Sequence, residues 1–277
     1  MVPDYLLPPI SNDSFLYMKI LFIGDIVGKP GRNAVKEGLP GIVNKLKIDF
    51  VIANAENAAG GFGITKSVGE ELFSLGIDVL TSGNHIWDKK EAVTYISKEN
   101  RLLRPANYPG EVPGSGSIVM NTSAGEKIAV LNLSGRIFMQ PLDCPFQAAK
   151  KEVPVLKEQT KVIIVDFHAE ATSEKSAMGW YLDGDVSAII GSHTHVQTAD
   201  EKILPNGTAF ITDVGMTGPS DSVIGVNKEQ IINKFLTHIP VRFETATGET
   251  LLSCVVLEVN PKTGLSTSIQ RLQFTFS

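Results

Sequence analysis

Carboxylate, amide and imidazole side chains follow five of the apolar segments of this 277-residue chain. Each segment has the composition of a buried β-strand, and the polar residues come where the apolar run stops. Open α/β sheets bind ligands at the carboxyl edge of their strands, so side chains delivered there converge on one site. The residues concerned are Asp25, Glu56, Asn57, Asn84, His85, His168, His193 and His195.

These residue types have the chemistry of a metal centre. Imidazoles combined with carboxylate and amide oxygens, without cysteine, suit Fe, Mn or Zn, whereas Ca²⁺ prefers oxygen ligands alone. Seven candidate ligands exceed the needs of one catalytic ion, and they fit two divalent ions with a bridging carboxylate. Because only Asp25 and Glu56 are anionic, two such ions leave a charge of about +2, suited to a phosphate ester and a bound hydroxide. The seven are Asp25, Glu56, Asn57, Asn84, His168, His193 and His195.

Each of these motifs also has an ordinary structural interpretation. A single aspartate after a strand commonly belongs to a turn, a Glu-Asn pair fits a plain loop, and one His-x-His is often structural. Four of the five histidines of the chain nevertheless belong to the set. His238, in a predicted helix, is the exception, and we interpret it as a surface or packing residue. The joint pattern therefore favours a metal site.

Alternating apolar runs and helical periodicity provide the scaffold. Continuous runs such as 162–165 suit strands covered on both faces, and the alternation indicates a layered α/β fold. We predict one domain of two sheets with flanking helices, a hairpin at Asn206-Gly207, and final strands near 250–257 and 267–275. Other strands are predicted at 19–24, 50–54, 78–82, 128–133, 161–167 and 186–191. Helices are predicted at 32–47, 65–75, 87–98, 146–158 and 173–181.

Composition limits the classes of function. Apolar residues make up 43% of the chain and charged residues 20%, which supports a large core and argues against disorder. A net charge of −5 argues against binding of duplex nucleic acid, and no apolar run reaches the roughly 18 residues that a membrane span needs. The chain has only two cysteines, Cys144 and Cys254, without a CxxC pattern, and such low usage suits a reducing compartment and predicts a cytoplasmic protein.

Residues 1–17 are predicted to be a loose N-terminal extension, because they lack a basic segment and prolines interrupt their apolar stretch. The predicted domain therefore covers residues 18–277. Within it, we expect the loops 104–117 and 134–145 to form walls of the pocket. Three basic residues are interpreted as solvated charges rather than phosphate contacts, namely Lys29, Arg104 and Arg136.

Two glycine-rich segments lack the spacing of known nucleotide-binding loops. Gly24–Lys29 is one residue shorter than a phosphate-binding loop and has Pro30 where that loop needs Ser or Thr. Gly60-Gly61-Phe62-Gly63 has no third glycine at the dinucleotide-binding position. We interpret the second segment either as backbone that passes close to the metal pocket or as a simple turn.

The order of the motifs resembles the signature of the calcineurin-like metallophosphoesterases, and longer segments are similar to the YmdB-like branch of that superfamily. The residues that carry the superfamily signature are Asp25, Gly83–His85, His168 and Gly191–His195. The segments that resemble the branch are Gly24–Arg32, Ala53–Ala58, Thr81–Asp88 and Gly191–Thr198. The resemblance extends from Met18 to about Phe274.

This resemblance implies a four-layer α/β/β/α sandwich with a dinuclear centre of iron. It also implies a phosphodiesterase that hydrolyses small substrates, cyclic nucleotides (2′,3′ or 3′,5′) among them, through a metal-bound hydroxide. By motif position, Glu56 bridges the ions and His85 donates a proton, while Asp88 either orients the His85 ring or is a charge at a helix N-terminus. One site is completed by Asp25, Asn57 and His195, and the other by Asn84, His168 and His193.

Two departures from the superfamily pattern match the YmdB-like branch. Val27 stands where an Asp-x-His motif has its histidine, and the Glu56-Asn57 segment replaces the usual Gly-Asp-x-x-Asp. Iron, manganese and zinc therefore all remain candidates. An alternative function is a regulatory or interaction protein that keeps the metal site with little turnover, but His85, which metal binding alone does not need, favours the enzyme. The chain is also compatible with a homo-oligomer.

Overall fold

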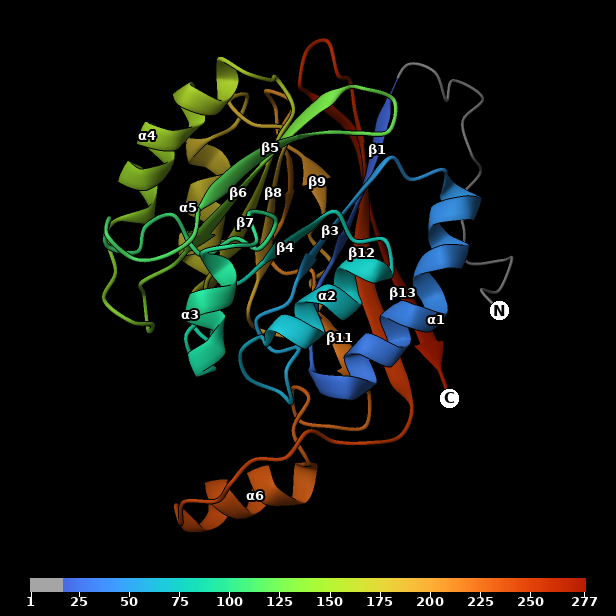
Figure 1. The fold of residues 1–277 in the computed structure, drawn as a ribbon, viewed down its shortest axis with the longest axis vertical. Helices are drawn as coiled ribbons and strands as arrows, with labels where there is room; N and C mark the ends of the chain where they lie inside the picture. The colour runs from blue at the N-terminus through green and yellow to red at the C-terminus, as the bar shows by residue number, and fades with distance from the viewer. Residues whose placement is uncertain (1–16) are drawn as a thin grey trace.

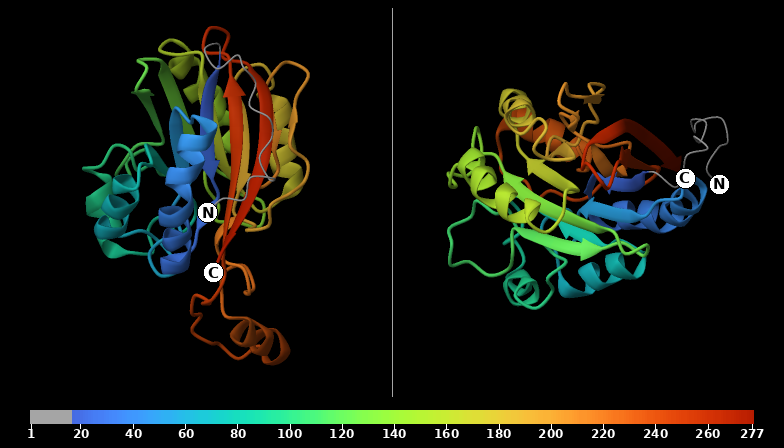
Figure 2. Two further views of the ribbon diagram at one scale, coloured as in Figure 1. Left: turned by 90° about the vertical axis from the view of Figure 1, so that its right-hand side faces the viewer. Right: turned by 90° about the horizontal axis from the view of Figure 1, so that it is seen from above.

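Two β-sheets packed face to face form the centre of the computed structural model, which describes residues 17–277 (Figure 1). Helices cover the outer face of each sheet, as two further views show (Figure 2). The layers therefore run α/β/β/α, and the fold implied by the sequence resemblance is confirmed. The extension expected at residues 1–17 lies, except for Tyr17, outside the described residues.

The first sheet has a parallel centre and an antiparallel flank. β1 (Met18–Ile23) lies parallel to β3 (Phe50–Asn54), and β3 lies parallel to β4 (Val79–Thr81). Because these strands run parallel, their carboxyl ends lie at one edge of the sheet. β12 (Thr250–Val259) pairs antiparallel with both β1 and β13 (Ser266–Phe276). The short strands of this sheet are β2 (Asp25–Ile26) and β11 (Met216–Pro219).

The second sheet places further carboxyl ends near the same site. Its four inner strands run parallel to one another in the order β6-β7-β8-β10. These are β6 (Lys127–Ser134), β7 (Ile163–His168), β8 (Ala188–Ser192) and β10 (Ala209–Ile211). Its antiparallel edges are β5 (Ser117–Asn121) and β9 (Lys202–Ile203), and the predicted Asn206-Gly207 hairpin connects β9 to β10.

Helices cover the two outer faces. The helices on the first sheet's side are α1 (Gly28–Leu46), α2 (Lys66–Ser74) and α3 (Lys90–Ile96). The helices on the second sheet's side are α4 (Pro145–Lys157) and α5 (Thr172–Tyr181). None of the helices in the described part of the chain is both long and apolar enough to cross a membrane.

The burial of both faces of a strand explains why its sequence is a continuous run of apolar residues. Successive residues of a strand point to opposite faces, and in β1 both faces are covered. Ile20 and Phe22 pack in the layer between the two sheets, whereas Leu21 and Ile23 pack against the helices outside the first sheet. All four side chains are fully buried.

The predicted elements are found with shifted ends. The helix predicted at 87–98 begins only at Lys90, because residues 84–88 form turns beside the site. The prediction misses β5, a half-buried edge strand, and β11, which contains a glycine and a proline. His238 lies at the end of α6 (Lys228–Thr237) with a left-handed backbone, φ 57°.

One segment leaves the sandwich. Residues 220–249, the arm, connect β11 to β12 and carry α6, which projects from the lower end of the molecule in Figure 1. Ile231 is the buried residue of this helix. Large apolar side chains on this helix and just beyond its end are exposed, namely Ile232, Phe235, Leu236 and Ile239.

Candidate metal centre

The carboxyl edges of the two sheets meet, and the predicted residues converge there. The first sheet contributes Asp25 in β2 immediately after β1, Glu56 and Asn57 after β3, and Asn84 after β4. The second sheet contributes its residues from the ends of β7 and β8. These are His168, His193 and His195.

The tightest group combines a carboxylate with two imidazoles. His168 Nε2 lies 3.0 Å from Glu56 Oε1 and 2.9 Å from His193 Nδ1. The ligand atoms of these three residues all lie within 4.8 Å of one another, a spacing at which one ion can contact all of them. Asn84 belongs to the same group, since its Oδ1 lies 3.1 Å from His168 Nε2.

The remaining candidates surround Asp25. Its Oδ1 atom lies 3.8 Å from His168 Nδ1 and 3.9 Å from His195 Nε2. The Asn57 amide nitrogen lies 3.2 Å from both His195 Nε2 and Glu56 Oε1, so Glu56 is in contact with both groups of residues. All seven predicted ligands are thus brought together.

In each of the three candidate histidine ligands, one ring nitrogen contacts a group outside the ligand cluster, and the other ring nitrogen lies toward the other candidate ligands. His195 Nδ1 donates to the Ile224 carbonyl (2.8 Å), and His193 Nε2 contacts Glu170 Oε2 (3.1 Å). His168 Nδ1 contacts Ser192 Oγ (3.0 Å). A metal-ligating histidine characteristically donates its other N–H in this way, which fixes the tautomer that can bind a metal.

A buried aspartate stands behind His168. Asp166 accepts hydrogen bonds from Ser192 Oγ (2.7 Å) and Asn54 Nδ2 (3.1 Å), so that a chain of contacts runs from Asp166 through Ser192 to His168. Burial raises the pKa of Asp166 to about 6. The sequence analysis missed this residue, although Asp166 and His168 are two apart in a strand and therefore share a face.

The buried carboxylate of Glu56 needs a positive charge beside it to stay ionised. Burial opposes ionisation of Glu56, yet the adjacent His168 holds the pKa of this carboxyl at about 2. Burial likewise disfavours a charged His168, but Glu56 raises its pKa to about 9. Burial and the neighbouring His168 lower the pKa of His193 to about 3, so this imidazole is neutral, as metal binding requires. A proton on His168 or a divalent cation can supply the charge.

Two further features fit a cation. Asp25 is fully buried, and its Oδ1 atom has no hydrogen-bond partner among the described residues. Such an orphaned carboxylate oxygen is costly unless an ion satisfies it. Gly83 also leaves room beside the cluster, since a Cβ there would lie 2.1 Å from His168 and 2.4 Å from Glu56. The residues present therefore fit a divalent metal centre.

An internal ion pair holds the histidine loop in an unusual conformation. His193 and His195 have left-handed backbones, with φ of 102° and 68°. The buried Asp213 accepts hydrogen bonds from the backbone and hydroxyl of Thr194 (2.9 and 2.8 Å) and pairs with the buried Lys175 (2.7 Å). The surrounding structure thus determines a strained loop at the site.

His85 stands apart from the ligand atoms. Its backbone N–H donates to Glu56 Oε2 (3.1 Å), while its ring contacts Asp88 Oδ2 through Nδ1 (2.8 Å) and lies edge-on against Phe62. Asp88 precedes α3 and its N-cap residue, so the structure shows the contact that orients the ring. Among the described residues, no hydrogen-bond partner is found for His85 Nε2.

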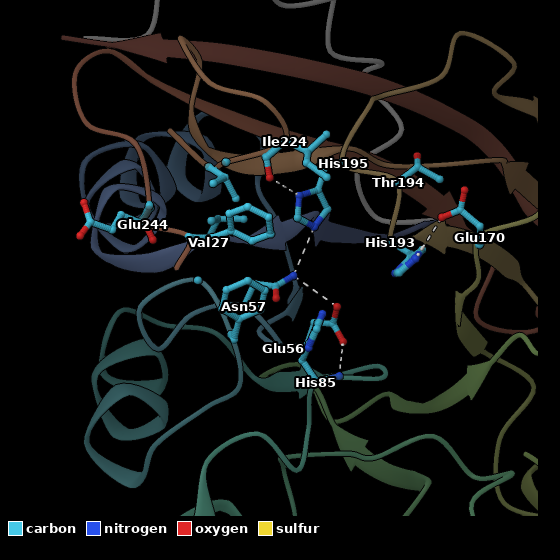
Figure 3. Close-up of a pocket in the computed structure, with 16 residues that line it drawn as sticks. Val27, Glu56, Asn57, His85, Glu170, His193, Thr194, His195, Ile224 and Glu244 are labelled. Carbon is cyan, nitrogen blue, oxygen red and sulfur yellow. Dashed lines mark hydrogen bonds and ion pairs between the residues drawn. The ribbon is translucent and has the colours of Figure 1, made fainter. Parts of the chain in front are cut away.

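A pocket of about 290 Å³ opens beside the cluster (Figure 3). Glu56, Asn57, His193 and His195 line it on one side, and residues 224–226 and 243–245 of the arm line it on another. The expected walls at 104–117 and 134–145 were wrong, because no residue of those loops lines this pocket. The basic residues Lys29, Arg104 and Arg136 do not line it either, and Arg104 is buried, donating to the carbonyls of Val112, Pro113 and Pro105.

Known proteins resemble the chain over nearly its whole length. The family model described as YmdB-like protein matches residues 21–272. The chain belongs to the YmdB-like family. It is 51% identical over 255 residues to a protein of Bacillus subtilis (strain 168) named as a 2′,3′-cyclic-nucleotide 2′-phosphodiesterase, with 92% of this chain and 96% of that protein covered.

Two solved structures of similar sequence have the same YmdB-like architecture. A hypothetical protein from Thermus thermophilus is 40% identical, with a TM-score of 0.88 and coverage of 94% of this chain and 100% of that one. A protein from Mycoplasma pneumoniae described as a novel phosphatase is 38% identical, with a TM-score of 0.88 and 94% of each chain covered. The family resemblance drawn from the motifs is therefore confirmed.

Proposed function

We propose that this chain is a metal-dependent phosphodiesterase of small substrates, and that 2′,3′-cyclic nucleotides are its substrate class, with 3′,5′-cyclic nucleotides as the alternative. The observation that carries the proposal is the position of His85. This imidazole lines the pocket beside a complete set of metal ligands without belonging to it. The name of the Bacillus subtilis relative supports the substrate class.

We propose two cation sites that share Glu56. Asp25, Asn57 and His195 complete the first, and Asn84, His168 and His193 complete the second. Contacts of Glu56 on both sides support its bridging role, since Oε1 lies beside His168 and also beside the Asn57 amide. We propose iron as the metal, with manganese or zinc as alternatives. Two such cations would offset the charge of a phosphate group and lower the pKa of a coordinated water.

The chain's own residues handle the leaving group. His85 lines the pocket and Asp88 occupies its Nδ1 atom, which leaves Nε2 for the substrate in this proposal. A protonated imidazole there donates to the leaving oxygen as the P–O bond breaks, and Asp88 stabilises the charged ring before transfer. Such proton donation contributes about 10²–10⁴-fold to a rate.

The charges of the pocket favour a diester. Among the described residues that line it, none is lysine or arginine, while Glu170 and Glu244 contribute carboxylates besides that of Glu56. A phosphodiester carries one negative charge and a phosphomonoester close to two, so a lining without cationic side chains suits the diester. The small volume likewise suits a mononucleotide rather than duplex nucleic acid.

We also propose a cytoplasmic location and self-association. The low cysteine count of the chain, two in all, supports the first. The exposed apolar side chains on the arm, among them Phe235 and Leu236, support the second, since exposed apolar groups commonly mark interfaces.

An assay panel tests the proposed function. Purified protein, with its metal content measured by elemental analysis, is given adenosine 2′,3′-cyclic phosphate, adenosine 3′,5′-cyclic phosphate and adenosine 3′-monophosphate. We expect metal-dependent turnover of a cyclic diester and little release of phosphate from the monoester. Preferential turnover of the monoester, or no turnover of any compound by the metal-loaded protein, would contradict the proposal.

A further inference from the structure

The arm forms the apolar side of the pocket. The apolar residues that line the cavity from the arm are Ile224, Val226 and Phe243, next to Glu244 and Thr245, and Val27 lines it just before α1. The opposite side carries the carboxylate, amide and imidazole groups of the candidate metal centre (Figure 3). The pocket is therefore divided into a polar half that suits a phosphate and an apolar half that the reaction itself does not use.

The apolar half is held in place by backbone contacts. Ile224 has a left-handed backbone (φ 48°), which is strained for a β-branched residue, and its carbonyl accepts the hydrogen bond of His195. On the far side of the wall, the Asn227 N–H donates to the Glu244 carbonyl (2.9 Å) and the Ala246 N–H to the Gly225 carbonyl (3.0 Å). Segments 224–227 and 244–246 thus form one paired unit that is attached to the site.

Two aromatic side chains line this pocket. Phe243 is partly buried, and Lys234 of α6 lies over its ring at 4.6 Å, which restrains the ring from the arm side. Phe62 comes from the Gly60–Gly63 segment, in which all three glycines have positive φ. Its ring centroid lies 5.1 Å from that of His85. The glycine-rich segment therefore does more than turn the chain, because it places an aromatic ring next to the proton donor.

We propose that Phe243 and Phe62 form a binding site for the nucleobase, so that the enzyme selects cyclic nucleotides over other small diesters. This inference rests on the proposed function and extends it. With the phosphate at the ligand cluster and the leaving oxygen at His85, the ribose lies at the border of the two halves and the base lies against Phe62 and Phe243. Stacking of a base on an aromatic side chain contributes about 1–3 kcal/mol and accepts any base.

Phe243→Ala is the decisive variant, because Phe62 also contacts His85 and its replacement would affect the proton donor. The kcat/KM values are measured for adenosine 2′,3′-cyclic phosphate and for glycerol 1,2-cyclic phosphate, which has a five-membered cyclic diester and no base. We expect the variant to lose about 5- to 150-fold on the nucleotide, which is what a stacking energy of 1–3 kcal/mol corresponds to, and less than 2-fold on the glycerol diester. Phe243→Trp should restore the nucleotide rate.

A binding measurement complements the kinetics. By calorimetry, Phe243→Ala should weaken binding of adenosine 3′-monophosphate by a similar factor and leave binding of inorganic phosphate unchanged. Phe138→Ala is the control, because the Phe138 side chain is 89% exposed and lies outside the pocket lining and outside the arm. It should behave like the wild type in both experiments.

The outcomes separate the two proposals. If the wild type cleaves both diesters with equal kcat/KM, or if Phe243→Ala affects both substrates equally or neither, the nucleobase site is refuted while the phosphodiesterase stands. If the wild type cleaves neither diester, the proposed function itself fails. A loss confined to the nucleotide supports the inference.

Discussion

Gly83→Ala tests whether space beside the cluster is needed for metal binding. The added Cβ would lie 2.1 Å from His168 Cδ2 and 2.4 Å from Glu56 Oε2, whereas ordinary contacts begin at 3.4 Å. The two side chains must therefore retreat by about 1 Å, and metal–ligand distances tolerate only about 0.2 Å. Gly83 is not among the glycines with positive φ, so the substitution introduces a clash without backbone strain.

We expect Gly83→Ala to lower metal affinity by about 10²-fold or more, because it displaces two ligands together. Overpacking should cost the metal-free protein about 1–3 kcal/mol of unfolding free energy, which leaves the fold intact. Elemental analysis, metal titration and thermal unfolding with and without Mn²⁺ measure these effects. Gly110→Ala is the control, since a Cβ there contacts nothing within 4 Å. Wild-type affinity for two equivalents in Gly83→Ala would refute the reasoning.

Three other substitutions test separate parts of the site. Glu56→Ala should reduce bound metal toward zero, because the shared carboxylate is lost from both sites; retention of two equivalents, measured by elemental analysis, would exclude a bridging role. His85→Ala should keep both metals and lose about 10²–10⁴-fold on alkyl diesters, but far less on nitrophenyl diesters, whose leaving group needs no proton; an equal loss on both would exclude a proton donor. Lys175→Met should cost about 3–5 kcal/mol by denaturant unfolding, because Asp213 is left buried and unpaired, whereas Lys157→Met at an exposed pair should cost under about 1 kcal/mol; similar costs would show that the buried pair has no special role.

The sequence predicted the edge of the fold that carries the site. Its apolar runs located β1, β3, β4, β7 and β8, and the rule that ligands bind at the carboxyl ends of strands then selected the polar residues that follow them. All of the predicted ligands meet in the structure because parallel strands in both sheets place those ends together. Residue type and order along the chain were therefore sufficient to predict which side chains meet at the site.

The supporting contacts could not be predicted in the same way. Glu170 and the Ile224 carbonyl reach their histidines through tertiary contacts that no local pattern encodes. The left-handed backbones of His193 and His195 oppose the preference of non-glycine residues, and tertiary contacts such as those of the Lys175–Asp213 pair to the loop hold them in place. The arm was missed as a pocket wall because its position depends on how it folds back over the site.

The central claim is that two cations at this cluster are required for hydrolysis of a cyclic diester. It is tested most directly by removing metal with a chelator and titrating Mn²⁺ or Fe²⁺ back while turnover of adenosine 2′,3′-cyclic phosphate is followed. We predict that turnover is lost on chelation and rises to a plateau at two equivalents per chain. Full turnover after metal removal, or a plateau at one equivalent, would contradict the two-cation site.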